Sequence, residues 1–459
     1  MGTEAKKIKE TETKTLGPLH IWALGVGVVL VGQFMGWNLG IVKGGSLGTI
    51  LACWIIGILY VCLVVINTEM GTFVPEDGGQ YAMAKYFMGP LAAFNIGLML
   101  VFEYVMLEAA DAMVIGELLK SINPEIQAVP YILLSLLGLT YLNYRGTHGS
   151  MNVNIMLTGI AFATIVFLLL STKFYNPTES LLNLRENING LPYGWIGVLG
   201  AMQFGCWFYL GIEGTVLAAN ECKSKNRAIP LGAIIGLITL MIGATITWFV
   251  CSGLIKAEIL GASVYPLFDA AKATEIQYLP HVLFVGTMLS CLASANGCIA
   301  DASRAWCAMA EDTLIPKYFA VRHPKYRSPH RAIIFLLPIA IAFGFTGLLD
   351  QVVTFSIFSA LLVYLFTAYM MFGYRKMYPL KKIKRGYVSP MHPIPSIVLI
   401  FLVVLTLTGM YFGYWINILS GTIFYLLASV WFVFHRSKYM NLERFMAKGA
   451  SVLPKPERY

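Results

Sequence analysis

Long apolar segments with almost no charge recur along this chain and constrain its fold more than any other feature. Residues 47–68 and 151–171, for example, each supply about the 20 residues that a helix needs to cross a hydrocarbon core roughly 30 Å thick. Of the 459 residues, 57% are hydrophobic and only 12% are charged, whereas soluble domains carry about 25% charged residues. The runs are too long and continuous for a β-barrel. The sequence therefore predicts an all-α membrane protein.

Twelve transmembrane helices can be marked from these runs. They cover residues 19–43, 47–68, 91–120, 128–144, 151–171, 194–220, 229–255, 281–312, 331–348, 352–374, 394–412 and 414–435. If the N-terminus is cytoplasmic, the cytoplasmic segments hold 26 of the 33 Lys and Arg residues, which is the bias that membrane insertion favours. We therefore expect a multi-pass protein of the cytoplasmic membrane with both termini in the cytoplasm. The net charge of +9 then reflects topology and contact with the lipid bilayer, with no nucleic-acid partner.

Two of these spans combine glycine with a polar side chain near the midpoint. The first reads VVLVGQFMGWN over residues 28–38, where Gly32 precedes Gln33, and the sixth reads QFGCWFYLGIEG over residues 203–214, where Gly211 precedes Glu213. Paired glycine-interrupted helices in two halves of a chain indicate an inverted-repeat transporter, whose broken helices bind a polar solute through freed backbone groups. We therefore expect helix breaks at Gly32 and Gly211.

This interpretation divides the chain into five parts. They are a cytoplasmic tail (1–18), a first repeat (19–171), a second repeat (194–374), two further spans (394–435) and a second cytoplasmic tail (436–459).

The third span carries three acids, Glu103, Glu108 and Asp111, in the sequence FEYVMLEAADAMVIGELL. At about 100° per residue, Glu108 and Asp111 share one helical face, whereas Glu108 lies about 140° from Glu103. Each buried carboxylate costs at least a few kcal/mol unless it is paired, solvated or protonated. Apart from Lys43, Lys120 and Arg331 at span ends, Arg304 is the only Lys or Arg inside the spans, so a cationic substrate or a proton is the expected counter-charge.

Four motifs, in order, resemble those of the amino acid–polyamine–organocation superfamily, and the first resembles its ethanolamine permease-like branch. They are GPLHIWALGVGVVLVGQFMGWNLG, EMGTFVPEDGGQYAMAKYFMGP, WFYLGIEGTVLAANECKSKNRAIP and ASRAWCAMAEDTLIPKYFAVRHPKYRSPHRAI. This resemblance implies a LeuT-like core of five plus five inverted helices, with broken helices 1 and 6 forming the substrate site. It also implies a gating or proton role for Glu213, because the matching glutamate of related arginine/agmatine antiporters is a proton-sensitive gate, and it places Trp207 at a substrate-stacking or gate position.

The predicted site follows from the breaks, the acids and the aromatic residues around them, whose ring faces attract cations. The substrate-binding candidates are Val31, Gly32, Gln33, Gly36, Glu103, Glu108, Asp111, Trp207, Phe208, Tyr209, Gly211 and Asn296, and the gating candidates are Glu213 and Trp207. We expect Ser294 to bond back to its own helix, with a weak sodium site against the first span as the alternative. No cofactor and no other metal site are expected.

The predicted function is secondary active transport of a small amine, such as ethanolamine or another cationic amine or amino acid, by alternating access. Proton coupling, sodium coupling and exchange are all open, since the fifth span lacks the lysine that replaces sodium in some relatives. Gln33 stands where the ethanolamine branch carries an acid, and Glu108 and Asp111 could restore that charge. The alternatives are a zwitterionic amino acid permease and, less favoured, a channel or receptor. An enzyme is not expected, because the seven His residues form no catalytic cluster in the sequence.

Overall fold

The computed structural model describes residues 16–443, apart from 75, 77, 124 and 176–182, together with residue 445. Within these residues, every regular element is a helix, and one isolated bridge pairs Leu16 with Cys222. Nine of the described helices are long and apolar enough to cross a membrane. The predicted all-α membrane class is therefore confirmed. The predicted tails lie mostly outside the described residues.

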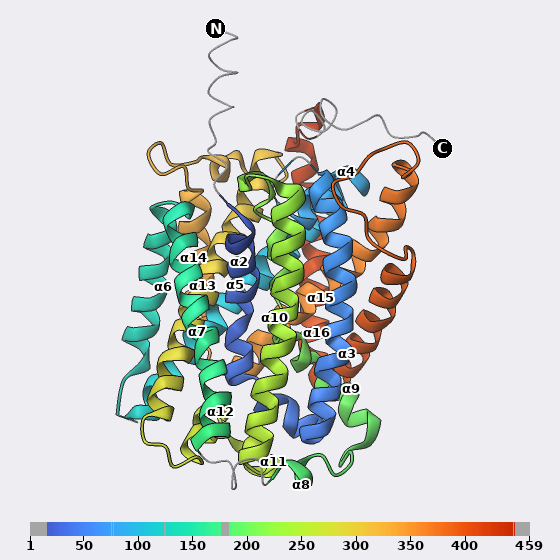
Figure 1. Cartoon of the computed structure of the whole chain (residues 1–459). Helices are drawn as coiled ribbons and strands as arrows, with labels where there is room; N and C mark the ends of the chain where they lie inside the picture. Colours follow the sequence, from blue (N-terminus) through green and yellow to red (C-terminus); the bar gives the residue numbers. More distant parts are fainter. Residues whose placement is uncertain are drawn as a thin grey trace.

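The helices follow one another along nearly the whole described chain (Figure 1). The longer ones are α2 (Pro18–Met35), α3 (Trp37–Phe73), α5 (Pro90–Ile122), α6 (Ala128–Tyr144), α7 (Thr147–Tyr175), α9 (Gly194–Trp207), α10 (Lys225–Leu254), α13 (Leu279–Glu311), α14 (His330–Gly344), α15 (Leu349–Met377) and α16 (Ile394–Phe434). The shorter ones are α4 (Gln80–Phe87), α8 (Leu184–Asn187), α11 (Ala257–Ala262), α12 (Pro266–Lys272), η1 (Ile212–Val216), η2 (Ala219–Glu221), η3 (Lys317–Ala320) and η4 (Arg436–Tyr439).

The two longest helices each contain a non-helical residue. Helix α3 has 37 residues and turns at Gly45, whose φ of 69° lies in the left-handed region that favours glycine. Helix α16 has 41 residues and is kinked at Tyr414. Helices of these lengths measure about 55–60 Å, nearly twice the hydrocarbon thickness. The kink at Gly45 lies in the predicted loop between the first two spans, and the kink at Tyr414 lies at the predicted start of the twelfth span. The count of twelve crossings stays a prediction.

The bundle encloses α2, α5 and α13: α13 packs against α2, α5 and α7, while α2 packs against α7 and α10 and α5 packs against α15. Almost every side chain of α2 from Ala23 onward is buried. Large apolar side chains on the outer helices remain exposed, among them Leu134 on α6 and Phe434 on α16, which are 68% and 70% exposed. In a membrane protein these side chains face lipid, so the burial pattern agrees with a bundle that crosses the bilayer.

Short helices mark the two ends of the bundle. Helix α4 lies at one end, and α8 and α11 lie at the other (Figure 1); we call these the α4 end and the α8 end. The segment between α3 and α5, which contains α4, contacts Asp312 at the end of α13. The segment after α15 contacts the last turns of α3, through Ser389 and Glu69. Two of the basic segments predicted to be cytoplasmic therefore begin at the α4 end.

Candidate functional site at the interrupted helices

The sixth predicted span is interrupted where the sequence predicts it. Helix α9 ends at Trp207, a turn follows, and the chain re-enters a 3-10 helix, η1, after Gly211, whose φ is 109°. A Cβ atom at Gly211 would lie 2.4 Å from Cγ1 of Val28, so both the backbone conformation and the close approach to α2 require glycine. The Gly211 N–H donates to the carboxylate of Glu213 at 3.0 Å, which stabilises the turn.

The first span is interrupted one turn later than predicted. Helix α2 continues through Gly32 to Met35, and Gly36 separates it from α3, with the Gly36 N–H bonded to the Gly32 carbonyl at 2.7 Å. The predicted break at Gly32 is therefore wrong. Glycine is needed there because a Cβ atom would lie 2.5 Å from the Trp207 carbonyl oxygen. Gly32 thus lets α2 pack directly against the last residue of α9.

Gln33 faces another helix rather than a gap between helices. Its side-chain amide donates to the Leu240 carbonyl of α10 at 2.9 Å, and its buried carbonyl oxygen has no partner among the described residues. A polar amide at the centre of a membrane helix is tolerated when it bonds to a neighbouring helix. In this arrangement the amide N–H group is therefore engaged by α10, and a contact between Gln33 and a substrate stays a prediction.

Aromatic residues fill the space around the two interruptions. The ring of Trp37 stacks on Phe208 with centroids 4.3 Å apart, while Tyr209 contacts Cys53 through its hydroxyl at 3.3 Å. Trp207 is buried, lies 3.2 Å from where a Cβ of Gly36 would stand, and has an indole N–H without a partner in the described part of the chain. The predicted aromatic residues are therefore gathered at one place. Val31 is buried in the last turns of α2 nearby.

The three acids of α5 are buried and lack cationic partners among the residues that the structure describes. Glu103 and Asp111 are 0% exposed and Glu108 is 2% exposed. Both carboxyl oxygens of Glu103 and of Asp111, and one of Glu108, have no hydrogen-bond donor there, apart from a longer-range contact of Asp111 with Ser294. Glu103 and Glu213 lie close enough to interact electrostatically. The site thus concentrates negative groups beside the interrupted helices.

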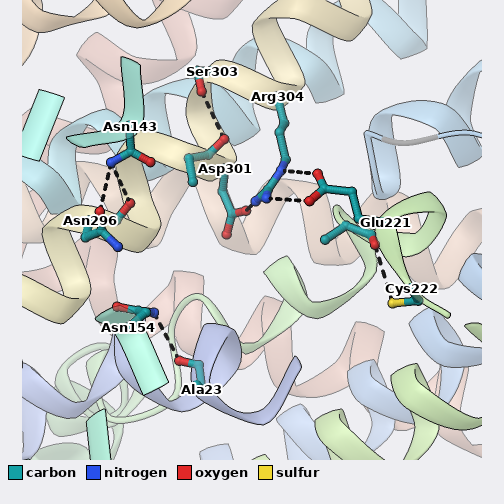
Figure 2. Close-up of polar contacts among 11 residues, drawn as sticks. Ala23, Asn143, Asn154, Glu221, Cys222, Asn296, Asp301, Ser303 and Arg304 are labelled. Carbon is teal, nitrogen blue, oxygen red and sulfur yellow. Dashed lines mark hydrogen bonds and ion pairs between the residues drawn. The ribbon is translucent and has the colours of Figure 1, made fainter. Parts of the chain in front are cut away.

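Arg304 does not neutralise these acids. Its guanidinium donates to Asp301 at 3.0 Å and to both oxygens of Glu221 at 3.0 and 3.3 Å (Figure 2). This pairing links α13 to η2, the element that follows the interruption in the sixth span. Sequence reasoning missed Asp301, although its position three residues before Arg304 on one helix was the signal that could have identified it.

Two polar residues of α13 form hydrogen bonds to neighbouring helices. Ser294 donates to the Val28 carbonyl of α2 at 2.6 Å, so the expected bond to its own helix is wrong. Asn296 accepts a hydrogen bond from Asn143 of α6 at 2.9 Å (Figure 2), which directs its side-chain oxygen toward α6. Asn154 of α7 donates to the Ala23 carbonyl at 3.3 Å. These contacts hold α2 against α7 and α13.

An apolar helical bundle with two adjacent interrupted helices and a buried set of polar groups is typical of membrane transporters. Residues 20–446 match the family described as amino acid permease. The chain belongs to this family, and the predicted resemblance to its superfamily is confirmed. The narrower likeness to the ethanolamine permease-like branch stays a prediction.

Known relatives span most of the chain. An uncharacterized transporter of Rhizobium meliloti strain 1021 is 47% identical over 433 residues, which are 93% of each protein. The branched-chain amino acid permease BcaP of Bacillus subtilis is 23% identical over 94% of this chain and 95% of its own. The vacuolar cationic amino acid transporter 4 of Arabidopsis thaliana is 24% identical over 72% of this chain and 58% of its own.

Proposed function

We propose that this protein is a secondary active transporter that moves a small amine or cationic amino acid across the cytoplasmic membrane by alternating access. One observation carries the proposal: Glu103, Glu108 and Asp111 are buried on α5 and none of them forms an ion pair within the described residues. The cytoplasmic-membrane location and the cytoplasmic position of the α4 end rest on the distribution of basic residues.

The energy of a buried carboxylate explains why a cationic substrate fits this site. Removing such a group from water costs several kcal/mol unless an opposite charge or hydrogen bonds compensate. A substrate ammonium would supply that charge when the site is loaded. The stacked rings of Trp37 and Phe208, with Trp207 beside them, supply apolar and π surface that favours an organic cation over a hydrated ion.

The electrostatic interaction between Glu103 and Glu213 supports coupling to protons. Two nearby buried carboxylates repel each other, so protonation of one of them relieves the repulsion. Glu213 also accepts from the Gly211 N–H at the interruption, so a change in its charge acts directly on the turn. Ser294 remains a weak candidate for sodium, because its hydroxyl is engaged by Val28.

A zwitterionic amino acid is the second candidate substrate. The interruptions after Met35 and Trp207 lie next to each other, since a Cβ atom at Gly36 would lie 3.2 Å from the Trp207 ring, and backbone groups at such breaks can bind an amine and a carboxylate together. The relative named a branched-chain amino acid permease supports this alternative, whereas the relative named a cationic amino acid transporter supports the first.

Uptake into proteoliposomes tests the proposal. The purified full chain is reconstituted and supplied with labelled ethanolamine, arginine, lysine or leucine, with and without a pH gradient and with sodium or potassium as the external cation. We expect saturable, counterflow-competent uptake of at least one amine, increased by an inward proton gradient. Uptake of leucine alone, with no inhibition by amines, would support the zwitterion alternative, and non-saturable flux would contradict a carrier.

Two variants test whether the acids of α5 bind the substrate. Asp111→Asn removes one of the unpaired carboxylates, whereas Glu117→Gln alters an exposed acid on the same helix that pairs with Lys120. We expect only the first to weaken amine uptake. Equal uptake by Asp111→Asn and the unaltered chain would remove α5 from the cationic-substrate model.

A further inference from the structure

The side chain of Asp301 has one carboxyl oxygen without a partner in the interior of the bundle. Asp301 lies on α13 and is 0% exposed. Its Oδ1 accepts a hydrogen bond from Arg304 at 3.0 Å (Figure 2), whereas its Oδ2 is bonded to no group in the described part of the chain. A buried polar atom without a partner costs about 1–3 kcal/mol, and more when the group is charged. The free Oδ2 atom is therefore a candidate for binding a proton or another cation.

A second unpartnered polar group lies beside this oxygen. The hydroxyl of Tyr104 on α5 is fully buried and also lacks a partner among the residues that the structure describes. A Cβ atom at Gly214 would lie 2.5 Å from Oδ2 of Asp301 and 3.1 Å from the Tyr104 hydroxyl oxygen. Because Gly214 has no side chain, α5, α13 and η1 approach closely enough to bring these two groups together.

The position of Gly214 connects Asp301 to the acids at the interruption. Gly214 directly follows Glu213, which accepts a hydrogen bond from the Gly211 N–H. Asp301 also interacts electrostatically with both Glu213 and Glu103. The titratable groups that act on Asp301 are Cys298 and Arg304 on α13, Glu103 and Tyr104 on α5, Glu213 on η1 and Glu221 on η2.

Electrostatics favours a bound proton in this cluster. The cluster contains one guanidinium, that of Arg304, and the carboxyl groups of Glu103, Glu213, Asp301 and Glu221. Arg304 is bonded to Asp301 and to both oxygens of Glu221. Buried carboxyl groups that repel one another do not all ionise together. At least one of these acids is therefore expected to carry a proton.

A link of increasing exposure leads from Asp301 to the α4 end. Asp301 lies ten residues before the end of α13 at Glu311, which is about 15 Å along the helix axis. The side chains of Asp301, Arg304 and Glu221 are 0%, 6% and 30% exposed, so access to water increases along the link. A guanidinium keeps its proton at every accessible pH. Arg304 is therefore a fixed charge between two acids and does not carry the proton itself.

We propose that Asp301 is a second proton-binding residue of this transporter, which passes a proton between the Glu103–Glu213 pair and the α4 end. The proton leaves a carboxyl oxygen of Glu213, binds Oδ2 of Asp301 and is then released to water. Neutral Asp301 attracts the Arg304 guanidinium less strongly, so α13 is held less firmly to η2 while the proton is bound. Proton release is thereby linked to opening at the α4 end. This inference rests on the proton-coupled transport proposed above.

Asp301→Asn tests the charge of this residue separately from its shape, because an amide oxygen still accepts from Arg304. The full chain and the variant are reconstituted into vesicles that contain a pH-sensitive dye. Labelled arginine or ethanolamine, whichever the unaltered chain carries, is supplied in counterflow at equal pH and under an inward proton gradient. A gradient of about one pH unit supports about tenfold accumulation when one proton is coupled. Asp301→Asn should lose this accumulation and the proton influx, with counterflow kept.

The outcomes separate this inference from the proposed function. Accumulation and proton influx in Asp301→Asn equal to those of the unaltered chain would overturn the role of Asp301 alone. Loss of counterflow together with accumulation would show that Asp301 supports the fold or the substrate site instead, and accumulation driven by sodium without proton influx would also overturn the inference. Absence of counterflow in the unaltered chain would contradict the proposed function, and the inference with it.

A matched control makes the same chemical change outside the cluster. Asp269→Asn alters an acid that is 35% exposed and lies 3.7 Å from Lys272. This variant should equal the unaltered chain in counterflow, in accumulation and in proton influx. A coupling defect as large as that of Asp301→Asn would show that the effect is not specific to the buried acid.

Glu221→Gln tests the link to the α4 end. It removes the more exposed partner of Arg304 and leaves the guanidinium to Asp301, which then holds a proton less tightly. We expect proton-driven uptake to reach half of its maximum at a pH lower by at least about 0.5 unit. An unchanged or higher value would contradict the part assigned to Arg304. Because Glu221 is partly exposed, this test remains available should Asp301→Asn fail to fold.

Discussion

Two regions of this protein bury carboxyl groups, and the structure treats them in opposite ways. At the α4 end, the fully buried ammonium of Lys85 pairs with Glu76 at 2.9 Å and with Asp312 at 2.8 Å. At the centre of α5, the carboxyl groups of Glu103 and Asp111 face no cation among the described residues. Lys85 and Asp312 are almost as completely hidden from water as Glu103 and Asp111, so burial alone does not distinguish the two sets. The two sets differ in whether the protein itself supplies a cationic partner.

The paired region contains further contacts between charged groups. Asp312 also accepts from the Tyr81 hydroxyl at 2.8 Å, and Glu69 is held by Arg375 at 2.7 Å and by Arg385. Burial raises the pKa of Asp312, and the Lys85 ammonium opposes that effect by favouring the carboxylate. Breaking such a pair leaves a buried charge without its partner, whereas the acids of α5 have no cationic partner to lose. The comparison therefore separates groups that hold the fold from groups that are free to bind a substrate or a proton.

Loss of the Lys85 ammonium should produce the largest change in stability. Lys85→Met leaves Glu76 and Asp312 close together without their cation, and removing one member of a buried ion pair costs about 3–5 kcal/mol. The thermal unfolding midpoint in detergent should fall sharply. The matched control is Lys256→Met, since Lys256 is 57% exposed where it pairs with Glu186, and its loss should cost under about 1 kcal/mol. Equal effects of the two variants would contradict the distinction between paired and exposed regions.

Neutralising an acid of the unpaired region should weaken substrate binding without lowering stability. Asp111→Asn should lower the affinity for a transported amine by about a hundredfold, because it removes a buried charge partner. Its unfolding midpoint should stay the same or rise, since no native ion pair is lost. Uptake kinetics and thermal unfolding are measured on the same preparation. A large loss of stability would show that Asp111 has a structural partner and belongs with the first region.

Arg436 offers an intermediate test at the α4 end. Its guanidinium donates to the carbonyls of Thr313, Leu314 and Ile315 at 2.8, 3.0 and 2.7 Å, which fixes η4 to the segment after α13. Arg436→Ala should destabilise the fold by about 1–2 kcal/mol, as expected for several charge-assisted hydrogen bonds at a half-buried site. Lys438→Ala, two residues away on an exposed side chain, should leave the unfolding midpoint unchanged.

An exposed pair on α5 should show the smallest effect. Glu117 and Lys120 are 45% and 44% exposed and lie 2.9 Å apart. Glu117→Gln should change stability by no more than about 0.5 kcal/mol, because water and salt screen such pairs. Amine uptake should equal that of the unaltered chain. A strong transport defect would extend the functional acids of α5 toward the end of the helix.

Local sequence was enough to predict the interruption at Gly211 but not the one at Gly36. Gly211 adopts a left-handed conformation, and a glycine beside a polar residue within an apolar span is a direct sequence signal for such a turn. Gly32 looks equivalent in sequence, yet it serves a close approach to the Trp207 carbonyl while the helix continues. A glycine that permits a turn and a glycine that permits contact cannot be told apart without the neighbouring helix.

The partners of the polar side chains could not be predicted for the same reason. Gln33 bonds to α10, Ser294 to α2 and Asn296 to α6, and in each case the two residues lie more than 150 positions apart in the chain or belong to different halves. Asp301 was missed because its role depends on Arg304 and Glu221 meeting at one point. Sequence spacing gives the face of a helix, but packing decides which helix that face meets.

By itself, the sequence determined that the chain is a helical membrane protein, because apolar segments of this length can satisfy their backbone only as helices in lipid. It also determined that acids lie at mid-span on α5, since their positions are fixed by counting along an apolar run. Only the tertiary structure decided which charges are paired. Folding brings Lys85 next to Glu76 and Asp312, whereas it places no cation beside the acids of α5. The sequence could not decide this, because charges pair over a few ångströms and separation along the chain does not measure that distance.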